Sequence, residues 1–129
     1  MEVAKLIYAK TSEICWVAWV VQGINAIKDI IDYNDPWKKG DNIVYTDQEH
    51  LSSGHTWLVL RKKGVEIKKI KNINGKIMVF DMEKAVDENT KIVCINSTSV
   101  GSGFTYDIKK VCKITRALGC LEIISLSES

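Results

Sequence analysis

The sequence predicts an α/β fold, a three-layer sandwich around a mostly parallel sheet, in a single domain over residues 1–129. Short apolar runs rich in β-branched residues alternate along the chain with segments of helical period. Several runs are almost entirely apolar, as expected for strands buried on both faces. Such alternation favours a parallel sheet with right-handed crossovers. The predicted strands are residues 14–19, 42–46, 65–70, 91–96 and 120–125.

Four helices are expected between these strands. An isoleucine stripe over residues 24–31 predicts the first, which should end at the turn around Pro36. Apolar residues 57–60 indicate a second helix, which stops before Gly64, and residues 81–86 a short third. Apolar residues at helical spacing over 108–118 predict a fourth helix, ended by Gly119 because glycine tolerates the left-handed conformation found after many helices.

Composition excludes several classes of function. The net charge is +2, from 18 basic and 16 acidic residues spread along the chain, so no strong field would attract nucleic acid. The longest apolar run, residues 14–21, is too short to span a bilayer, and no secretory signal opens the chain. We therefore expect a cytoplasmic protein without nucleic-acid or membrane partners.

The four cysteines show neither a C-x-x-C motif nor histidines at metal-ligand spacing, so we expect no metal site. Each lies in an apolar segment, which favours four buried thiols, with a buried disulfide left open. Nothing nearby in the sequence would activate one as a nucleophile. The four cysteines are Cys15, Cys94, Cys112 and Cys120.

Parallel sheets bind ligands at the carboxyl ends of their strands, so three loops are candidates for a site. They span residues 20–23, 47–53 and 97–105.

Four stretches carry a resemblance to a known family. Residues 40–50 read Gly-Asp-Asn-Ile-Val-Tyr-Thr-Asp-Gln-Glu-His, and residues 91–108 place a glycine loop between a strand and a helix. Residues 75–91 resemble the family's linking stretch, and residues 23–27 its first cofactor-side helix. Taken in this order, the chain resembles the class V aminotransferase superfamily, which includes cysteine desulfurases and isopenicillin N epimerase-like enzymes. The pattern from Gly103 to Asp107 reads closer to the epimerase-like members.

The resemblance implies part of the large domain of a fold-type I pyridoxal-phosphate (PLP) transferase. It implies that His50 descends from the histidine that stacks on the pyridine ring and that can assist proton transfer. It also places Gln22 and Gly23 at a helix N-terminus that would bind the cofactor phosphate. These three residues are our candidate cofactor-binding set, and no catalytic residue is assigned.

Four departures from the family pattern argue against PLP chemistry by this chain alone. The family's Schiff-base lysine follows a Ser-x-His-like stretch beyond the matched region; Ser53-Gly54-His55 is in the wrong register and is followed by Thr56. Val20 and Val21 replace small hydroxyl residues that bind phosphate. The family carboxylate that pairs with the pyridinium nitrogen matches Ser125. Val100 stands at a position that often contacts the cofactor.

Three hypotheses remain open. In the first, the chain is a truncated or degenerate relative that binds PLP weakly or not at all and never covalently. In the second, it is one chain of a split enzyme, completed by a partner. In the third, it is a non-catalytic binding or scaffold module that uses the remnant cleft. An uncovered sheet edge and the dimeric family favour a homodimer or a complementing chain.

Overall fold

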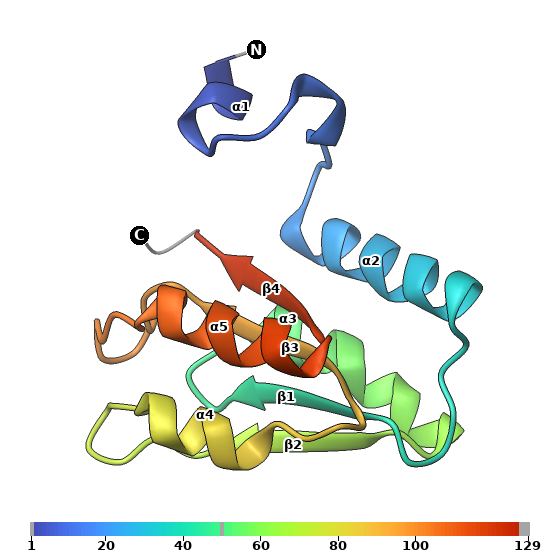
Figure 1. Ribbon diagram of the computed structural model, residues 1–129, viewed down its shortest axis with the longest axis vertical. Coiled ribbons are helices and arrows are strands. Elements are labelled where there is room, and N and C mark those ends of the chain that lie inside the picture. Colours follow the sequence, from blue (N-terminus) through green and yellow to red (C-terminus); the bar gives the residue numbers. More distant parts are fainter. Residues whose placement is uncertain (1, 50, 127–129) are drawn as a thin grey trace.

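The computed structural model describes residues 2–49 and 51–126, and for residues 51–53 it describes the backbone only. Eleven elements follow one another along the described residues (Figure 1). They are α1 (Glu2–Leu6), η1 (Thr11–Glu13), α2 (Val20–Asn34), β1 (Asn42–Thr46), α3 (Leu51–Leu58), η2 (Val59–Lys63), β2 (Glu66–Ile70), α4 (Val79–Ala85), β3 (Thr90–Asn96), α5 (Ile108–Leu118) and β4 (Leu121–Ser125).

The four strands form one parallel sheet in the order β2-β1-β3-β4. Helices α2 and α3 cover one face, and α4 and α5 cover the other, which gives the predicted three layers (Figure 1). Four of the five predicted strands are therefore confirmed to within one residue at each end, and so is the α/β class.

A separate apolar cluster fills the space on each face of the sheet. On the α2 and α3 face, Trp57 packs with Ile43 and Ile92, all three at 0% exposure. On the other face, Val44 and Val93 pack with helix residues such as Met82 and Val111. Consecutive residues of β1 and of β3 thus contribute to opposite clusters, which explains why these strands read as continuous apolar runs.

The last helix begins and ends as its sequence predicts. Asp107 is the N-cap of α5, and its side chain accepts a hydrogen bond from the Lys110 N–H at 3.2 Å. Gly119 follows the helix with φ +71°, and its N–H contacts the carbonyls of the last turn. These two residues fix the bounds of α5, and β4 follows within two residues.

Two expectations are wrong. Segment 14–19 forms no strand, because none of the described strands lies beside it to accept its backbone hydrogen bonds. Cys15 lies in that segment and is exposed, whereas Cys94 and Cys120 are buried and Cys112 is half-buried; all four thiols are free. No described helix is long and apolar enough to cross a membrane.

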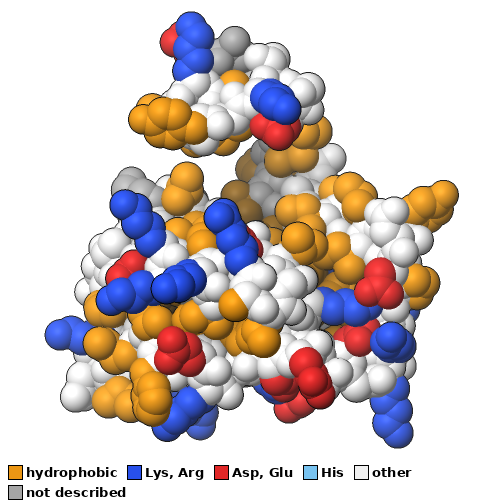
Figure 2. All heavy atoms as spheres, viewed as in Figure 1, with side chains coloured by type: hydrophobic (Ala, Val, Ile, Leu, Met, Phe, Trp, Pro, Cys, Tyr) orange, Lys and Arg blue, Asp and Glu red, His pale blue; other side chains and the backbone are white. Residues whose placement is uncertain are grey.

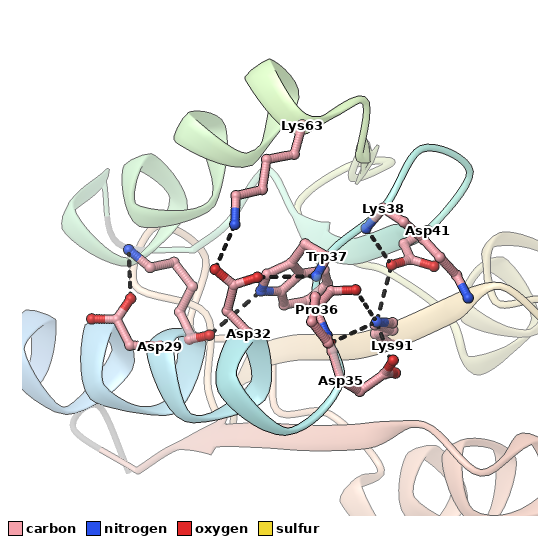
Figure 3. A network of polar contacts seen from close by, with 10 residues as sticks. Asp29, Asp32, Asp35, Pro36, Trp37, Lys38, Asp41, Lys63 and Lys91 are labelled. Atoms are coloured by element: carbon pink, nitrogen blue, oxygen red, sulfur yellow. Dashed lines mark hydrogen bonds and ion pairs between the residues drawn. The ribbon is translucent and has the colours of Figure 1, made fainter.

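Lys91 ties the start of β3 to the connection between α2 and β1 (Figure 3). Its ammonium lies 3.0 Å from the Asp41 carboxylate and 2.8 Å from that of Asp35, and it donates to the carbonyls of Asp35 and Pro36. It also lies 5.2 Å from the centre of the buried Trp37 ring. Burial alone would lower the pKa of Lys91, but the two carboxylates outweigh it and raise that pKa.

We expect Lys91→Met to lower the free energy of unfolding by about 3 kcal/mol, because it leaves the Asp41 carboxylate buried without its cation. The Asp41 side chain is only 7% exposed in this pair. The control is Lys110→Met, whose pair with Asp107 is exposed and should cost less than about 1 kcal/mol. Urea unfolding measures both; equal losses would show that the Lys91 network adds no more to stability than the exposed Lys110 pair.

Candidate functional site

The candidate site lies at the carboxyl ends of β1 and β3, where the chain leaves these two neighbouring strands in opposite directions. From β1 the chain turns back through α3 to β2, whereas from β3 it continues through α5 to β4 on the other side. In a parallel sheet the loops at such a point leave a crevice outside the carboxyl ends of the two strands. Residues 47–49 and 97–105, which belong to two of the three predicted loops, follow β1 and β3 at this point.

Asp47, the first residue after β1, fixes the turn that follows β2. Its carboxylate accepts hydrogen bonds from the Asn72 N–H at 3.0 and 3.1 Å and from the Asn72 side-chain amide at 3.0 Å. The Asn72 side-chain oxygen accepts in turn from the Gly75 N–H at 2.9 Å. One carboxylate thereby holds the β2 turn against the end of β1.

Gln48 joins the β2 turn to the loop after β3. Its amide group donates to the Gly75 carbonyl at 2.9 Å and to the Ser102 hydroxyl at 3.1 Å, and it accepts from the Tyr106 hydroxyl at 3.1 Å. The Ser102 hydroxyl also donates to the Gly75 carbonyl at 2.6 Å. The two predicted loops therefore meet at this side chain.

Glu49 reaches across to the end of β3. Its Oε1 accepts from the Asn96 N–H at 2.7 Å and from the Thr46 hydroxyl at 3.3 Å. Burial raises the pKa of this carboxyl from 4.5 to about 7, and the two hydrogen bonds offset only part of that rise. Glu49 therefore changes its charge near neutral pH, which an ordinary glutamate does not do.

Two buried polar atoms near this contact have no hydrogen-bond partner among the described residues. They are Oε2 of Glu49 and Nδ2 of Asn96. Glu49 also borders a small cavity of about 130 Å³, lined with Tyr45, Thr46, Asp47, Gly54, His55, Leu58 and Lys69. The crevice thus offers one unused acceptor and one unused donor, the kind of groups that a bound polar molecule or an ordered water would satisfy.

The thiol beside this contact is protonated. Burial and the nearby Glu49 charge raise the pKa of Cys94 to about 12. A neutral buried thiol is a weak nucleophile and a weak ligand. Among the described residues, no group of three or more histidines, cysteines and carboxylates is arranged to hold a metal ion.

The candidate cofactor residues are placed as follows. His50 lies outside the described residues, directly after Glu49. Gln22 is exposed in the first turn of α2, where its side-chain oxygen accepts from the Ala18 N–H at 2.9 Å. The Gly23 N–H already bonds to the Trp19 carbonyl at 3.3 Å. The role of these residues toward a cofactor stays a prediction.

The first turn of α2 lies at the carboxyl-end side of the sheet, because the other end of α2 contacts Lys91 at the start of β3. The helix begins at Val20 without a side-chain cap, three residues earlier than Gly23. The side chains of Val20 and Val21 in this turn are therefore apolar, and the side chain of Gln22 is hydrogen-bonded to the Ala18 N–H. Only backbone N–H groups remain there to meet an anion.

The sequence analysis placed Asp47 and Gln48 in a candidate loop without assigning them a role, and it did not single out Asn96. All three stand at or just after the carboxyl end of a buried strand, where polar residues follow a long apolar run. That position is the signal by which the candidate loops were chosen. Their partners were not predictable, because Asn72, Gly75 and Ser102 come from turns whose approach depends on packing.

Glu49→Gln should stabilise the protein at pH 8 and have little effect at pH 4.5. The folded-state pKa of about 7 lies above the ordinary 4.5, so the wild type loses stability as the pH rises through this window, by at most about 3 kcal/mol. Glutamine stays neutral and can still accept from Asn96. Thermal unfolding from pH 4 to 8 measures the difference, with the exposed Glu83→Gln as control; parallel profiles for wild type and variant would contradict the raised pKa.

Gly75→Ala should destabilise the crevice. A Cβ on Gly75 would lie 2.9 Å from the Ser102 Cβ, and the residue has φ +76°, which only glycine adopts without strain. We expect a loss of about 1–3 kcal/mol in the free energy of unfolding. Gly101→Ala, in the neighbouring loop, meets open space and is the matched control. A loss of the same size in both variants would show that the close approach does not constrain the loops.

Comparison with known proteins identifies the family to which this chain is similar. A family model described as "Aminotransferase class-V" matches residues 1–127. The "Probable cysteine desulfurase" of Methanothermobacter thermautotrophicus is 30% identical over 129 residues, which are 99% of this chain and 31% of the relative. The "Cysteine desulfurase IscS" of Buchnera aphidicola is 28% identical over 130 residues, or 99% of this chain and 32% of the relative.

Solved structures agree with these relatives. The apo cysteine desulfurase of Thermococcus onnurineus superposes with a TM-score of 0.84 at 26% identity, over 95% of this chain and 30% of that chain. The chain thus spans about a third of the proteins it matches. These relatives are named as desulfurases, and the closer likeness to epimerase-like members stays a prediction. The match along nearly its whole length shows that this chain belongs to the class V aminotransferase family.

Proposed function

We propose that this chain is a degenerate relative of the class V PLP enzymes, which keeps the cofactor crevice but does not carry out PLP chemistry by itself. One observation carries the proposal: the first turn of α2 presents Val20 and Val21 where the family has hydroxyl residues, and Gln22 is engaged with Ala18. A phosphate there would meet backbone N–H groups and a helix dipole alone.

The residues present fit PLP poorly on the side of its phosphate. Each absent hydrogen bond to a charged group removes about 1.5–3 kcal/mol of binding free energy. On the side of the ring, His50 is the one candidate that the family pattern supplies, and Ser125 at the end of β4 cannot act as an ionised carboxylate. When bound in the family, the cofactor supplies an electron sink. Here we expect weak, non-covalent association at most.

Assembly with another polypeptide belongs to the same proposal. The relatives are about three times as long as this chain, so the crevice of a complete enzyme would draw on parts beyond these residues. A complementing chain would supply such parts, whereas a homodimer would pair two copies of the same residues. A cytoplasmic location, expected from the sequence, belongs to the same proposal. The alternative of a binding module is favoured by the two unpartnered atoms of Glu49 and Asn96.

The test compares pyridoxal phosphate with pyridoxal, which lacks the phosphate. We expect both to bind the wild type with Kd above about 100 μM and within about threefold of each other, because the helix N-terminus adds little. Val20→Ser combined with Val21→Thr should tighten binding of the phosphate form about tenfold or more and leave pyridoxal unchanged.

Val59→Thr is the matched control, since Val59 is exposed like Val20 and lies in η2. Binding is followed by fluorescence quenching and by borohydride reduction. A tight, reducible adduct that disappears on replacement of a single lysine would overturn the proposal, because it would show a working cofactor site in this chain.

A further inference from the structure

Helix α5 carries a concentration of positive charge on its exposed side. Its 11 residues include four cations and no acidic residue, whereas the whole chain has a net charge of only +2, so the rest of the chain is net negative. Lys109, Lys113 and Arg116 stand at i, i+4 and i+7, and Lys110 lies beside them, so all four occupy neighbouring positions of one helical face. Figure 2 shows basic side chains gathered over this helix.

Two of these cations are left without an ion pair. Lys110 lies 3.2 Å from the carboxylate of Asp107, and Arg116 lies 3.6 Å from a carboxylate of β4. Among the described residues, no carboxylate lies within ion-pair distance of Lys109 or Lys113, and both lysines are exposed. This row of side chains can therefore accept carboxylates from another molecule without breaking an existing pair.

An apolar pocket opens beside this row, between α5 and α4. Its volume is about 220 Å³, and side chains of both helices and of residues 104–107 line it. Three lining residues, Ile77, Met82 and Val111, belong to the core and are at most 2% exposed. On the rim, Met78 is 58% exposed. Because packing of the core fixes its floor, the pocket is formed before any ligand arrives.

The pocket and the charged row meet at Lys110. This residue lines the pocket, and its side chain is 69% exposed. On another wall, Phe104 contacts the Tyr106 ring edge to face, with 5.3 Å between the ring centroids, and the Tyr106 hydroxyl is bonded to Gln48. A molecule that fits this place has an apolar group for the pocket and negative charge next to it.

We propose that the α4–α5 face, made up of Lys109, Lys110, Lys113 and this pocket, binds an acidic segment of a partner protein. One apolar side chain of that segment occupies the pocket, and the carboxylates that flank it pair with the lysines. The proposal does not depend on cofactor binding or on the proposed function.

Other occupants fit this face less well. Nucleic acid and anionic lipid surfaces present closely spaced phosphates, but the exposed Glu83 of α4 and Asp107 interrupt the positive surface, and phosphates do not fill an apolar pocket. A second copy of this chain can offer Asp29 and Asp35 of its α2 end, whose side chains are 73% and 70% exposed. That contact joins two different surfaces, so it would propagate into a ring or filament rather than close a dimer.

Two synthetic peptides serve as probes. Each has a short run of glutamates on either side of a central residue, which is leucine in one peptide and serine in the other, and both carry a fluorescent label. By anisotropy at low salt, we expect the leucine peptide to bind the wild type with a Kd below about 100 μM. It should bind at least about fivefold more tightly than the serine peptide, because only leucine gains from burial in the pocket.

Charge reversal on α5 tests the lysines. Lys109→Glu combined with Lys113→Glu should weaken both peptides at least about tenfold, because two attractive charges become repulsive. The matched control is Arg61→Glu combined with Lys62→Glu, which changes the net charge equally but lies in η2, beside α3 on the other face of the sheet. The control should bind both peptides within about threefold of the wild type.

Met78→Ser tests the pocket. Met78 is the N-cap of α4, a position where serine is preferred, so the variant should keep the wild-type unfolding midpoint. It should weaken the leucine peptide about threefold or more and leave the serine peptide unchanged, because it removes apolar contact at the rim. The backbone amide resonances of Met82 and Val111 should shift with the leucine peptide and not with the serine peptide.

Four outcomes would overturn the proposal. The first is a Kd above about 1 mM for both peptides. The second is an equal loss of binding in the α5 and η2 variants, which would show attraction by net charge alone. The third is tighter binding of duplex DNA or of phosphatidylserine vesicles than of the leucine peptide. The fourth is self-association of the chain that Lys109→Glu combined with Lys113→Glu abolishes in sedimentation, which would assign the face to a second copy.

Discussion

The burial of β3 between β1 and β4 is the constraint from which the rest of the molecule follows. Six of its seven residues are buried, and its side chains alternate between the two apolar clusters. Because all its neighbours run parallel to it, their polar ends collect at the same edge, where Glu49 meets Asn96. At the opposite edge, Lys91 forms an ion pair with Asp35, which follows the last residue of α2. One strand thereby positions both the crevice and the helix that faces it.

Under the proposed function, the crevice keeps the framework of a cofactor site whose ligand contacts have changed. Asp47 is bonded to the turn after β2, Gln48 to that turn and to the loop after β3, and Glu49 to the end of β3, so residues 47–49 are held in a fixed position after β1. In contrast, the helix end that would hold an anion has hydrocarbon side chains at Val20 and Val21. Preservation of the framework reflects packing, which the whole domain needs, whereas ligand contacts can change without loss of the fold.

Much of the fold could be predicted from the sequence, because local signals agree with the tertiary structure. β1 has an apolar centre and is buried along its whole length, and Gly119 ends α5 with the positive φ that its position indicated. Segment 14–19 carries the same kind of signal, yet a strand exists only beside another strand, and sequence pattern does not show whether one is present. For the same reason Cys15 is exposed in an apolar stretch. The raised pKa of Glu49 could not be predicted from the sequence either, since it arises from burial.

The contacts of residues 47–49 also bear on how the chain reaches its native state. Asp47 bonds to a residue 25 positions away, Glu49 to one 47 positions away and Gln48 to one 54 positions away. Contacts of such separation close slowly, because loop entropy is lost before they form. A ribosome must therefore release most of the domain before the crevice exists, and any ligand of this site meets a finished domain rather than a nascent one.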